Sequence, residues 1–315
     1  MVFGMLGSVL WAITSYFNPI GYRRRFENFQ EFRRRLTVPL LAVELGYHDH
    51  FELRDEDAEI LVRLLGRDVL WQKERLLNVA MARLPAACTT VASVDCDVIF
   101  EQDGWVDEAL ALLERFPMIQ LFSRVHHLSR DWAPDRALGD AVELTQEAVA
   151  RAACRAPDPA LPLGNTTVPG PGVAVMGFAW AYRRDVLARH GFYDVCIVGG
   201  GNTAMLGAAF GRPDTAIQVH AMNAAQESMY REWASAFHRS IAGRVGFLGG
   251  DVFHLWHGRL EDRWARRRHL DLGRFGFDPR NDIAIDETGC WRWNSDKREL
   301  HAYVRDYFLS RREDG

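Results

Sequence analysis

A buried strand that ends in two aspartates is the feature that most constrains this chain. The stretch from Thr89 to Phe100, TTVASVDCDVIF, runs through an apolar segment into Asp95 and Asp97 and then into a second apolar group. Side chains alternate along a strand, so the two carboxylates converge where the strand leaves the sheet. Converging carboxylates repel each other unless a cation neutralises them, and such oxygen ligands suit Mg²⁺ or Mn²⁺ shared with phosphate oxygens. The stretch predicts a metal–diphosphate site at the end of a central strand.

Composition narrows the class of protein. The chain has 315 residues, of which 48% are hydrophobic and 25% charged, which suits one large globular α/β domain or two small ones. A net charge of −4 gives no general reason to bind nucleic acid or an anionic membrane. Five cysteines without a C-x-x-C pair predict neither a disulfide framework nor a zinc site, and favour a reducing, cytoplasmic location.

The N-terminal region is apolar but does not read as a membrane segment. It lacks a basic start and a clean cleavage site, so we interpret it as leading into a first core strand rather than as a signal peptide. No run of 18 or more apolar residues occurs, which predicts no transmembrane span.

Strand and helix patterns alternate along the first half of the chain. Apolar runs predict strands, and apolar positions at helical spacing predict helices between them. The predicted strands are Ser8–Thr14, Val38–Leu45, Glu59–Leu65, the aspartate strand and Met118–Phe122, and the predicted helices are Tyr22–Leu36, Trp71–Leu84 and Trp105–Phe116. This order predicts an α/β fold with a mostly parallel, doubly wound central sheet flanked by helices.

The second half of the chain is less regular. Residues 123–171 are polar and contain several prolines, which fits a lid, a substrate loop or a plain surface excursion. Val173–Tyr182 predicts a return to the sheet, and residues 222–245, Glu261–Leu270 and Asp296–Arg312 predict helices. Gly199, Gly200 and Gly201 permit close approach of the backbone to a ligand, although the spacing is not a dinucleotide fingerprint.

Two histidines on a late strand are candidate metal ligands. His254 and His257 lie within Asp251–Gly258, three residues apart, so on an ideal strand they face opposite sides. One of them is expected to join the metal unless the strand ends between them, and His257, beside Gly258, is favoured. The alternative is that either histidine is an ordinary hydrogen-bonded side chain.

Taken in order, several blocks resemble GT-A glycosyltransferases of the family-two and polypeptide N-acetylgalactosaminyltransferase type. The blocks are Thr14-Ser15-Tyr16-Phe17-Asn18-Pro19, Lys73-Glu74-Arg75-Leu76-Leu77-Asn78, Asp95-Cys96-Asp97, the run from Gly177 through Gly191-Phe192-Tyr193-Asp194 to Asn202, and the histidine strand. The resemblance covers roughly residues 8–260. It implies a GT-A domain over residues 1–260, with a nucleotide-sugar-binding half at 1–122 and an acceptor-binding half at 123–260, followed by a helical extension at 261–315.

The resemblance also implies an activity and its site. The activity would be transfer of a sugar from a nucleotide-diphosphate sugar, with UDP as the expected nucleotide, to a hydroxyl of a glycan, protein or small-molecule acceptor. Mn²⁺ or Mg²⁺ would be held by Asp97, by His257 or His254, and by Asp95, which otherwise lies near the ribose. The donor would be bound by Thr14, Ser15, Phe17, Asn18, Glu44, Lys73 and Asp95, and the sugar or acceptor by Trp180, Gly200 and Gly201.

One position departs from the pattern. Inverting members of the family carry an acidic residue that deprotonates the acceptor where this chain has Asn202, and an amide cannot take up a proton near neutral pH. The enzyme would then retain configuration, use another carboxylate such as Asp194, or bind without catalysing. A haloacid-dehalogenase-like phosphatase, suggested by Asp95-Cys96-Asp97-Val98-Ile99, is the remaining alternative.

Overall fold

A seven-stranded sheet forms the centre of the protein in the computed structural model, which describes residues 9–164, 172–265 and 267–315. The strand order is β10-β6-β9-β4-β1-β2-β3. The strands are β1 (Leu10–Phe17), β2 (Leu40–Gly46), β3 (Ile60–Leu65), β4 (Thr90–Val94), β6 (Met118–Gln120), β9 (Ala179–Arg183) and β10 (Val245–Phe247). All are parallel except β9, which runs antiparallel to both β4 and β6. The predicted mostly parallel sheet is confirmed, and the returning strand enters it in the opposite direction.

The strand order reverses between β1 and β4. Strand β1 pairs in parallel with β2 on one side and with β4 on the other, so the crossovers that follow leave to opposite sides. In open α/β sheets the crevice at the carboxyl ends of two such strands is where ligands bind. Ser15 to Phe17 at the end of β1 and Asp95 after β4 therefore meet at this crevice.

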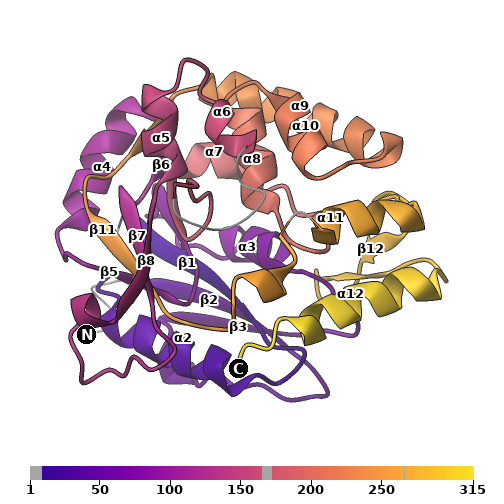
Figure 1. The fold of residues 1–315 in the computed structure, drawn as a ribbon, viewed down its shortest axis with the longest axis horizontal. Helices are drawn as coiled ribbons and strands as arrows, with labels where there is room; N and C mark the ends of the chain where they lie inside the picture. Colours follow the sequence, from indigo (N-terminus) through magenta and orange to yellow (C-terminus); the bar gives the residue numbers. More distant parts are fainter. Residues whose placement is uncertain (1–8, 165–171, 266) are drawn as a thin grey trace.

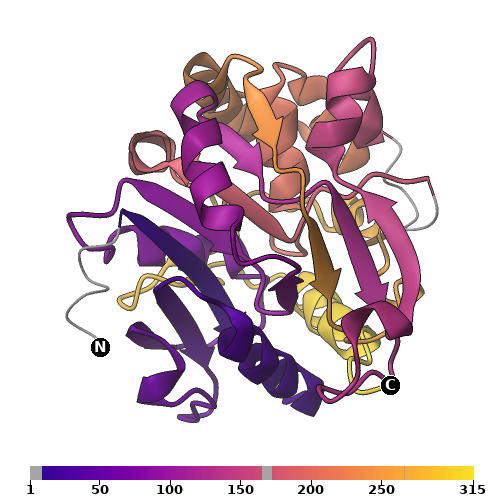
Figure 2. The same cartoon turned by 90° about the vertical axis from the view of Figure 1, so that its left-hand side faces the viewer.

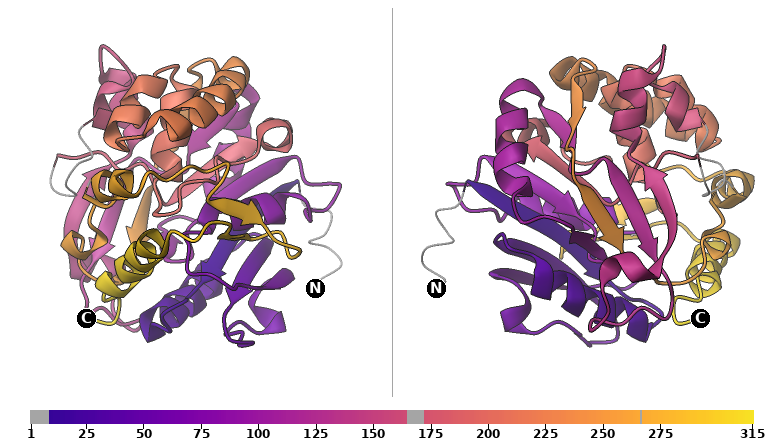
Figure 3. Two further views of the ribbon diagram at one scale, coloured as in Figure 1. Left: turned by 90° about the vertical axis from the view of Figure 1, so that its right-hand side faces the viewer. Right: turned by 60° about the vertical axis from the view of Figure 1, so that its left-hand side comes forward.

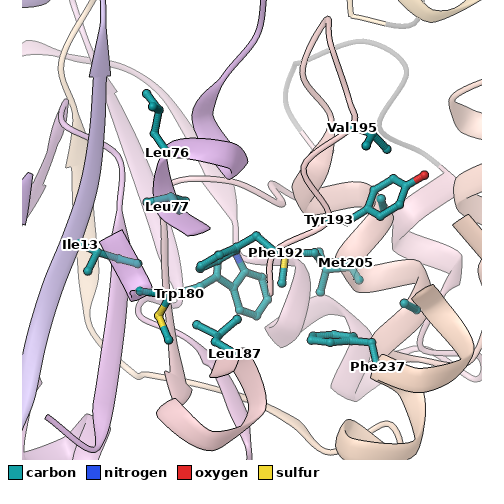
Figure 4. Packing of buried hydrophobic residues seen from close by; sticks show 14 of the residues in the cluster. Ile13, Leu76, Leu77, Trp180, Leu187, Phe192, Tyr193, Val195, Met205 and Phe237 are labelled. Atoms are coloured by element: carbon teal, nitrogen blue, oxygen red, sulfur yellow. The ribbon is translucent and has the colours of Figure 1, made fainter. Parts of the chain in front are cut away.

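Helices cover both faces of the large sheet. On one face lie α3 (Lys73–Met81), α7 (Arg184–His190), α8 (Gly201–Ala209), α9 (Pro213–Val219) and α10 (Ala224–Ile241), and on the other α2 (Arg23–Arg35) and α4 (Trp105–Arg115) (Figure 1). Alternation along β1 serves both layers, because Trp11 and Ile13 pack with the first group and Leu10 and Ala12 with the second. The core on the α3 face is shown in Figure 4, where Leu77 from α3 lies near Trp180.

A second sheet of four strands begins directly after the aspartates. Its order is β5-β11-β7-β8, with β5 (Val98–Phe100), β7 (Arg124–Leu128), β8 (Val142–Glu147) and β11 (Asp251–His254). Figure 2 shows β7 and β8 beside β11. The chain thus passes from the first sheet to the second across Asp95-Cys96-Asp97. The polar segment that begins at residue 123 forms β7 and β8, then α5 (Val149–Arg155) and α6 (Leu161–Gly164), while residues 165–171 lie outside the described part.

The C-terminal segment packs across the carboxyl edge of the large sheet (Figure 3). It contains α11 (Arg267–Leu272), a hairpin of β12 (Ile283–Ile285) and β13 (Trp291–Trp293), and α12 (Arg298–Ser310). Leu300, Val304, Tyr307 and Phe308 on α12 are buried, as the helical pattern predicts. The hairpin is an addition to the helices expected for residues 261–315. No helix in the described part of the chain combines the length and apolar character needed to cross a membrane.

Candidate metal and nucleotide-sugar site

Asp95 forms an ion pair at the end of β4. Its backbone N–H donates to the Phe178 carbonyl at 2.7 Å, and its carboxylate pairs with the ammonium of Lys73 at the start of α3. Burial raises the pKa of Asp95, and Lys73 opposes that change. The lysine and the first aspartate of the predicted donor site are therefore brought together.

Asp97 faces both histidines. Its Oδ2 lies 3.0 Å from Nε2 of His257 and 3.9 Å from Nε2 of His254. Strand β11 ends at His254, which pairs with Val98 across the second sheet, and the Leu255 N–H donates to the Asp97 carbonyl at 2.9 Å. Because the strand ends between the two histidines, both imidazoles reach the same side. Burial alone would raise the pKa of Asp97, but His257 and His254 hold it below its ordinary value.

A relay of hydrogen bonds fixes the tautomer of His254. The Gln146 amide donates through Nε2 to the Val173 carbonyl at 3.0 Å, so its Oε1 accepts from Nε2 of His127 at 2.8 Å. Burial lowers the pKa of His127 to about 4, so its ring is neutral and Nδ1 carries a lone pair. That nitrogen lies 3.0 Å from Nδ1 of His254, which must be the donor. Nε2 of His254 therefore presents a lone pair toward Asp97, as a metal ligand requires.

The second imidazole is backed by a buried carboxylate. Oε1 of Glu313, which is fully buried, lies 3.5 Å from Nδ1 of His257. Arg25 and Arg311 bind Glu313, at 2.9 Å from Nη2 of Arg25 and 2.5 Å from Nε of Arg311, and hold its pKa well below the ordinary value despite burial. Nδ1 of His257 makes no hydrogen bond within the described residues, but Arg263 donates through Nη2 to Nε2 of His257 at 3.1 Å, which places the lone pair of this ring on Nε2.

These groups fit a divalent cation. One ligand atom each from Asp97, His254 and His257 lies within 4.8 Å of the others. Oδ1 of Asp97 is buried and has no hydrogen-bond partner among the described residues, so a cation would satisfy an otherwise costly group. Two imidazoles and one carboxylate suit Mn²⁺ better than Mg²⁺, which prefers oxygen ligands.

A cavity of about 330 Å³ joins the cluster to the ends of β1 and α8. We call it the central cavity. Besides the three cluster residues, its walls include cationic groups and the glycine-rich turn, namely Arg25, Lys73, Gly200, Gly201, Arg263, Arg268 and Arg311. A cavity of this size at a switch point, with cations opposite a metal cluster, is suited to an anionic ligand that has an apolar part.

The structure distributes the predicted site residues over two groups. Lining the central cavity are Ser15, Phe17, Lys73, Asp95, Asp97, Gly200, Gly201, Asn202, His254 and His257. Thr14, Asn18, Glu44, Trp180 and Asp194 lie outside its lining. Residues of the predicted metal site, the predicted donor site and the glycine-rich turn therefore line the same cavity.

The second group is engaged in structural contacts. Thr14 Oγ1 donates to the Val94 carbonyl at 2.7 Å, Asn18 binds Glu52 and the Tyr22 backbone, and Glu44 accepts from the N–H groups of Glu52 and Leu53. Trp180 is 3% exposed and donates through Nε1 to the Met176 carbonyl, so it packs in the core (Figure 4). The Asp194 carboxylate binds Asn78 at 2.9 Å and Arg75 at 3.1 Å.

Several residues around the site were not found from the sequence, among them Arg263 and the three that support the histidines. His127 and Gln146 come from a segment expected to be a lid or loop, and Glu313 lies 56 residues beyond His257 in the described C-terminal segment. The adjacent histidines His126 and His127, within a run of alternating polar and apolar residues, were the sequence feature that could have indicated His127. Nothing local marks Glu313, because its role depends on where α12 packs.

Comparison with known proteins gives structural likeness only. No protein-family model matches the sequence, and no curated protein matches it. Similar solved structures include glucosyl-3-phosphoglycerate synthase from Mycobacterium tuberculosis in complex with Mn²⁺, UDP-glucose and phosphoglyceric acid, at 14% identity and a TM-score of 0.42, covering 93% of this chain and 90% of that one.

Two further solved structures cover a smaller share of this chain and have lower TM-scores. The catalytic domain of Drosophila β1,4-galactosyltransferase 7 has 14% identity and a TM-score of 0.30, over 66% of this chain and 62% of that one. The 4-diphosphocytidyl-2C-methyl-D-erythritol synthase of Anaerococcus prevotii has 11% identity and a TM-score of 0.33, over 85% and 98%. Likeness of this degree concerns the course of the chain and not its chemistry.

Proposed function

We propose that the protein is a metal-dependent glycosyltransferase that moves a sugar from a nucleotide-diphosphate sugar, with UDP as the expected nucleotide, to an acceptor hydroxyl. The observation that carries the proposal is the convergence of Asp97, His254 and His257 on one point in a cavity at the β1–β4 switch point. The order of blocks along the sequence, from Thr14 to the histidine strand, supports the same activity.

Each part of the cavity has a separate role in this proposal. Asp97, His254 and His257 hold a divalent cation, preferably Mn²⁺, and Lys73 and Asp95 orient the donor beside it. When bound, the cation stabilises the negative charge of the departing diphosphate. Ser15 and Phe17 line the nucleoside end of the cavity in this proposal, and the sugar lies beside Gly200 and Gly201, which also line it.

Arg263 is the residue that we expect to bind the diphosphate together with the cation. Arg263 lines the cavity, its Nε has no hydrogen-bond partner among the described residues, and its pKa is lowered to about 10 by burial and by Arg311. A buried guanidinium with a free donor is stabilised by an anion. A diphosphate between Arg263 and the cation would supply that anion.

The test is Mn²⁺-dependent release of UDP from a panel of UDP-sugars with glycan, peptide and small-molecule acceptors. Asp97→Asn is expected to abolish both turnover and the rise in melting temperature that Mn²⁺ causes, since a ligand bound only by the native state stabilises it. Asp251→Asn is the matched control. Asp251 is a buried aspartate on the same strand as His254, but it pairs with Arg124 and His126 outside the cavity.

Two results would refute the proposal. Tight UDP binding without turnover of any donor would favour a non-catalytic relative that binds nucleotide sugars. Hydrolysis of a generic phosphate ester that is lost in Asp95→Asn would favour the phosphatase. Asp251→Asn must retain the Mn²⁺ response for the Asp97→Asn result to be assigned to the site.

A further inference from the structure

A buried carboxylate on α3 has no role in the site described so far. Glu74 is 4% exposed, lines the central cavity, and follows Lys73 in the first turn of α3. Lys73 turns to Asp95, and Glu74 forms no ion pair within the described residues. A carboxylate kept in a cleft without a partner costs stability, so its position calls for a functional explanation.

Glu74 lies where α8 would be expected to supply an acid. A Cβ built on Gly201 would come within 2.3 Å of Oε1 and 2.4 Å of Cδ of Glu74, so the carboxyl group fills the space that a side chain at residue 201 would need. Asn202, the position at which the resemblance calls for an acidic residue, is next in the chain and also lines the cavity. The glycine at 201 and the amide at 202 thus coincide with a carboxylate delivered from a different helix.

The other carboxylates near the cavity are already bound. Asp95 pairs with Lys73, and Asp97 belongs to the three-residue cluster proposed to hold the cation. Asp194, the candidate base from the sequence, is held by Asn78 and Arg75 and lies outside the cavity lining. Among the described acidic residues that line the cavity, Glu74 remains available to accept a proton.

We propose that Glu74 is the general base that deprotonates the acceptor hydroxyl, in place of an acidic residue at position 202. The inference rests on the proposed glycosyltransferase function and names a catalytic residue for it. The hydroxyl proton passes to the Glu74 carboxylate as the acceptor oxygen forms a bond to the anomeric carbon. The bond from that carbon to the diphosphate oxygen breaks, and its electron pair leaves on the nucleoside diphosphate. Attack from the side opposite the leaving group inverts the anomeric configuration.

The surroundings of Glu74 suit this role. Burial raises its pKa to about 7, with Lys73 opposing the change, and a base is most effective when its pKa lies near the working pH. The titratable groups near enough to interact with its charge are Lys73 on its own helix, Asp95 after β4, Asp194 after α7, Tyr182 on β9 and Cys196. None of the cluster ligands Asp97, His254 and His257 is among them.

The experiment compares Glu74→Gln with Glu31→Gln, a change at a buried glutamate outside the cavity that pairs with Arg34 and Arg35. Glu74→Gln is expected to lower kcat by about 100-fold or more, as loss of a general base does. The KM for the donor, UDP affinity and Mn²⁺ affinity should change less than about 2-fold. Glu74→Asp should recover part of kcat, and product NMR should show inverted configuration.

Each other outcome decides between the two proposals. Turnover of Glu74→Gln within about 3-fold of wild type, retained configuration, or loss of kcat in Asp194→Asn but not in Glu74→Gln would overturn the role of Glu74 while leaving the glycosyltransferase in place. A wild-type protein that binds Mn²⁺ and UDP but turns over no donor would overturn the proposed function, and the base with it.

Discussion

Glu74→Gln should stabilise the protein, and the gain should depend on pH. Burial raises the Glu74 pKa from 4.5 to about 7 in the folded protein, whereas the unfolded chain keeps the ordinary value. Between these pH values the native state holds a proton that the unfolded state has released, so stability falls as pH rises. A pKa difference of about 2.5, at about 1.4 kcal/mol for each unit, makes the full cost about 3 kcal/mol above pH 7.

The substitution removes this cost because glutamine is neutral at every pH and close in shape to the protonated acid. Urea unfolding should show Glu74→Gln more stable than wild type by about 3 kcal/mol at pH 8.5, and by about 1 kcal/mol or less at pH 5. In a chain of this length the difference at pH 8.5 is on the order of 5 °C in melting temperature.

Glu31→Gln is the control for the unfolding measurement, because its stability is expected to change in the opposite direction. Its carboxylate pairs with Arg34 and Arg35, so removing the charge should lower stability rather than raise it. A gain for Glu74→Gln that is the same at both pH values, or a loss at pH 8.5, would refute the argument that burial of this carboxylate is uncompensated.

Three further predictions concern groups around the site. Gln146→Leu leaves His127 without its acceptor and releases the tautomer of His254, so the Kd for Mn²⁺ by calorimetry should rise about 10- to 100-fold; an unchanged Kd would contradict the relay. Glu313→Gln leaves two largely buried arginines without their counter-charge and should cost about 3 kcal/mol in urea unfolding; a neutral effect would show that the carboxylate is dispensable. Gly201→Ala should cost about 2 kcal/mol because its Cβ meets the Glu74 carboxyl group. In a Glu74→Ala background that cost should largely vanish, and equal costs in both backgrounds would contradict the contact.

Sequence patterns within a single segment predicted the strands and helices of the first half of the chain. Apolar runs located β1, β2 and β4, and helical spacing located α2, α3 and α4 to within a few residues. The meeting of Asp97 with the late histidines also followed from sequence, as did the condition under which both histidines could join it. Strand β11 does end at His254, so that condition holds.

Non-local pairing could not be predicted in this way. His127 lies beside His254 because β7 pairs in parallel with β11, 127 residues further along the chain, and nothing in either strand specifies that neighbour. Trp180 was expected in the sugar pocket, but alternation along β9 turns it and Tyr182 into the core beneath α3 and α8, whereas Ala179 and Ala181 face the other layer. A strand pattern shows which residues share a face, but not which layer covers that face.

Asp97 lies at the junction of the two sheets, three residues after β4 of the large sheet and directly before β5 of the small one. Val98, the first residue of β5, pairs with His254, and the Leu255 N–H donates to the Asp97 carbonyl, so the three proposed ligands share one end of the small sheet. A cation held by them would stabilise this junction, through which the chain leaves the large sheet. Any change that disrupts the junction would then weaken cation binding by the same free energy.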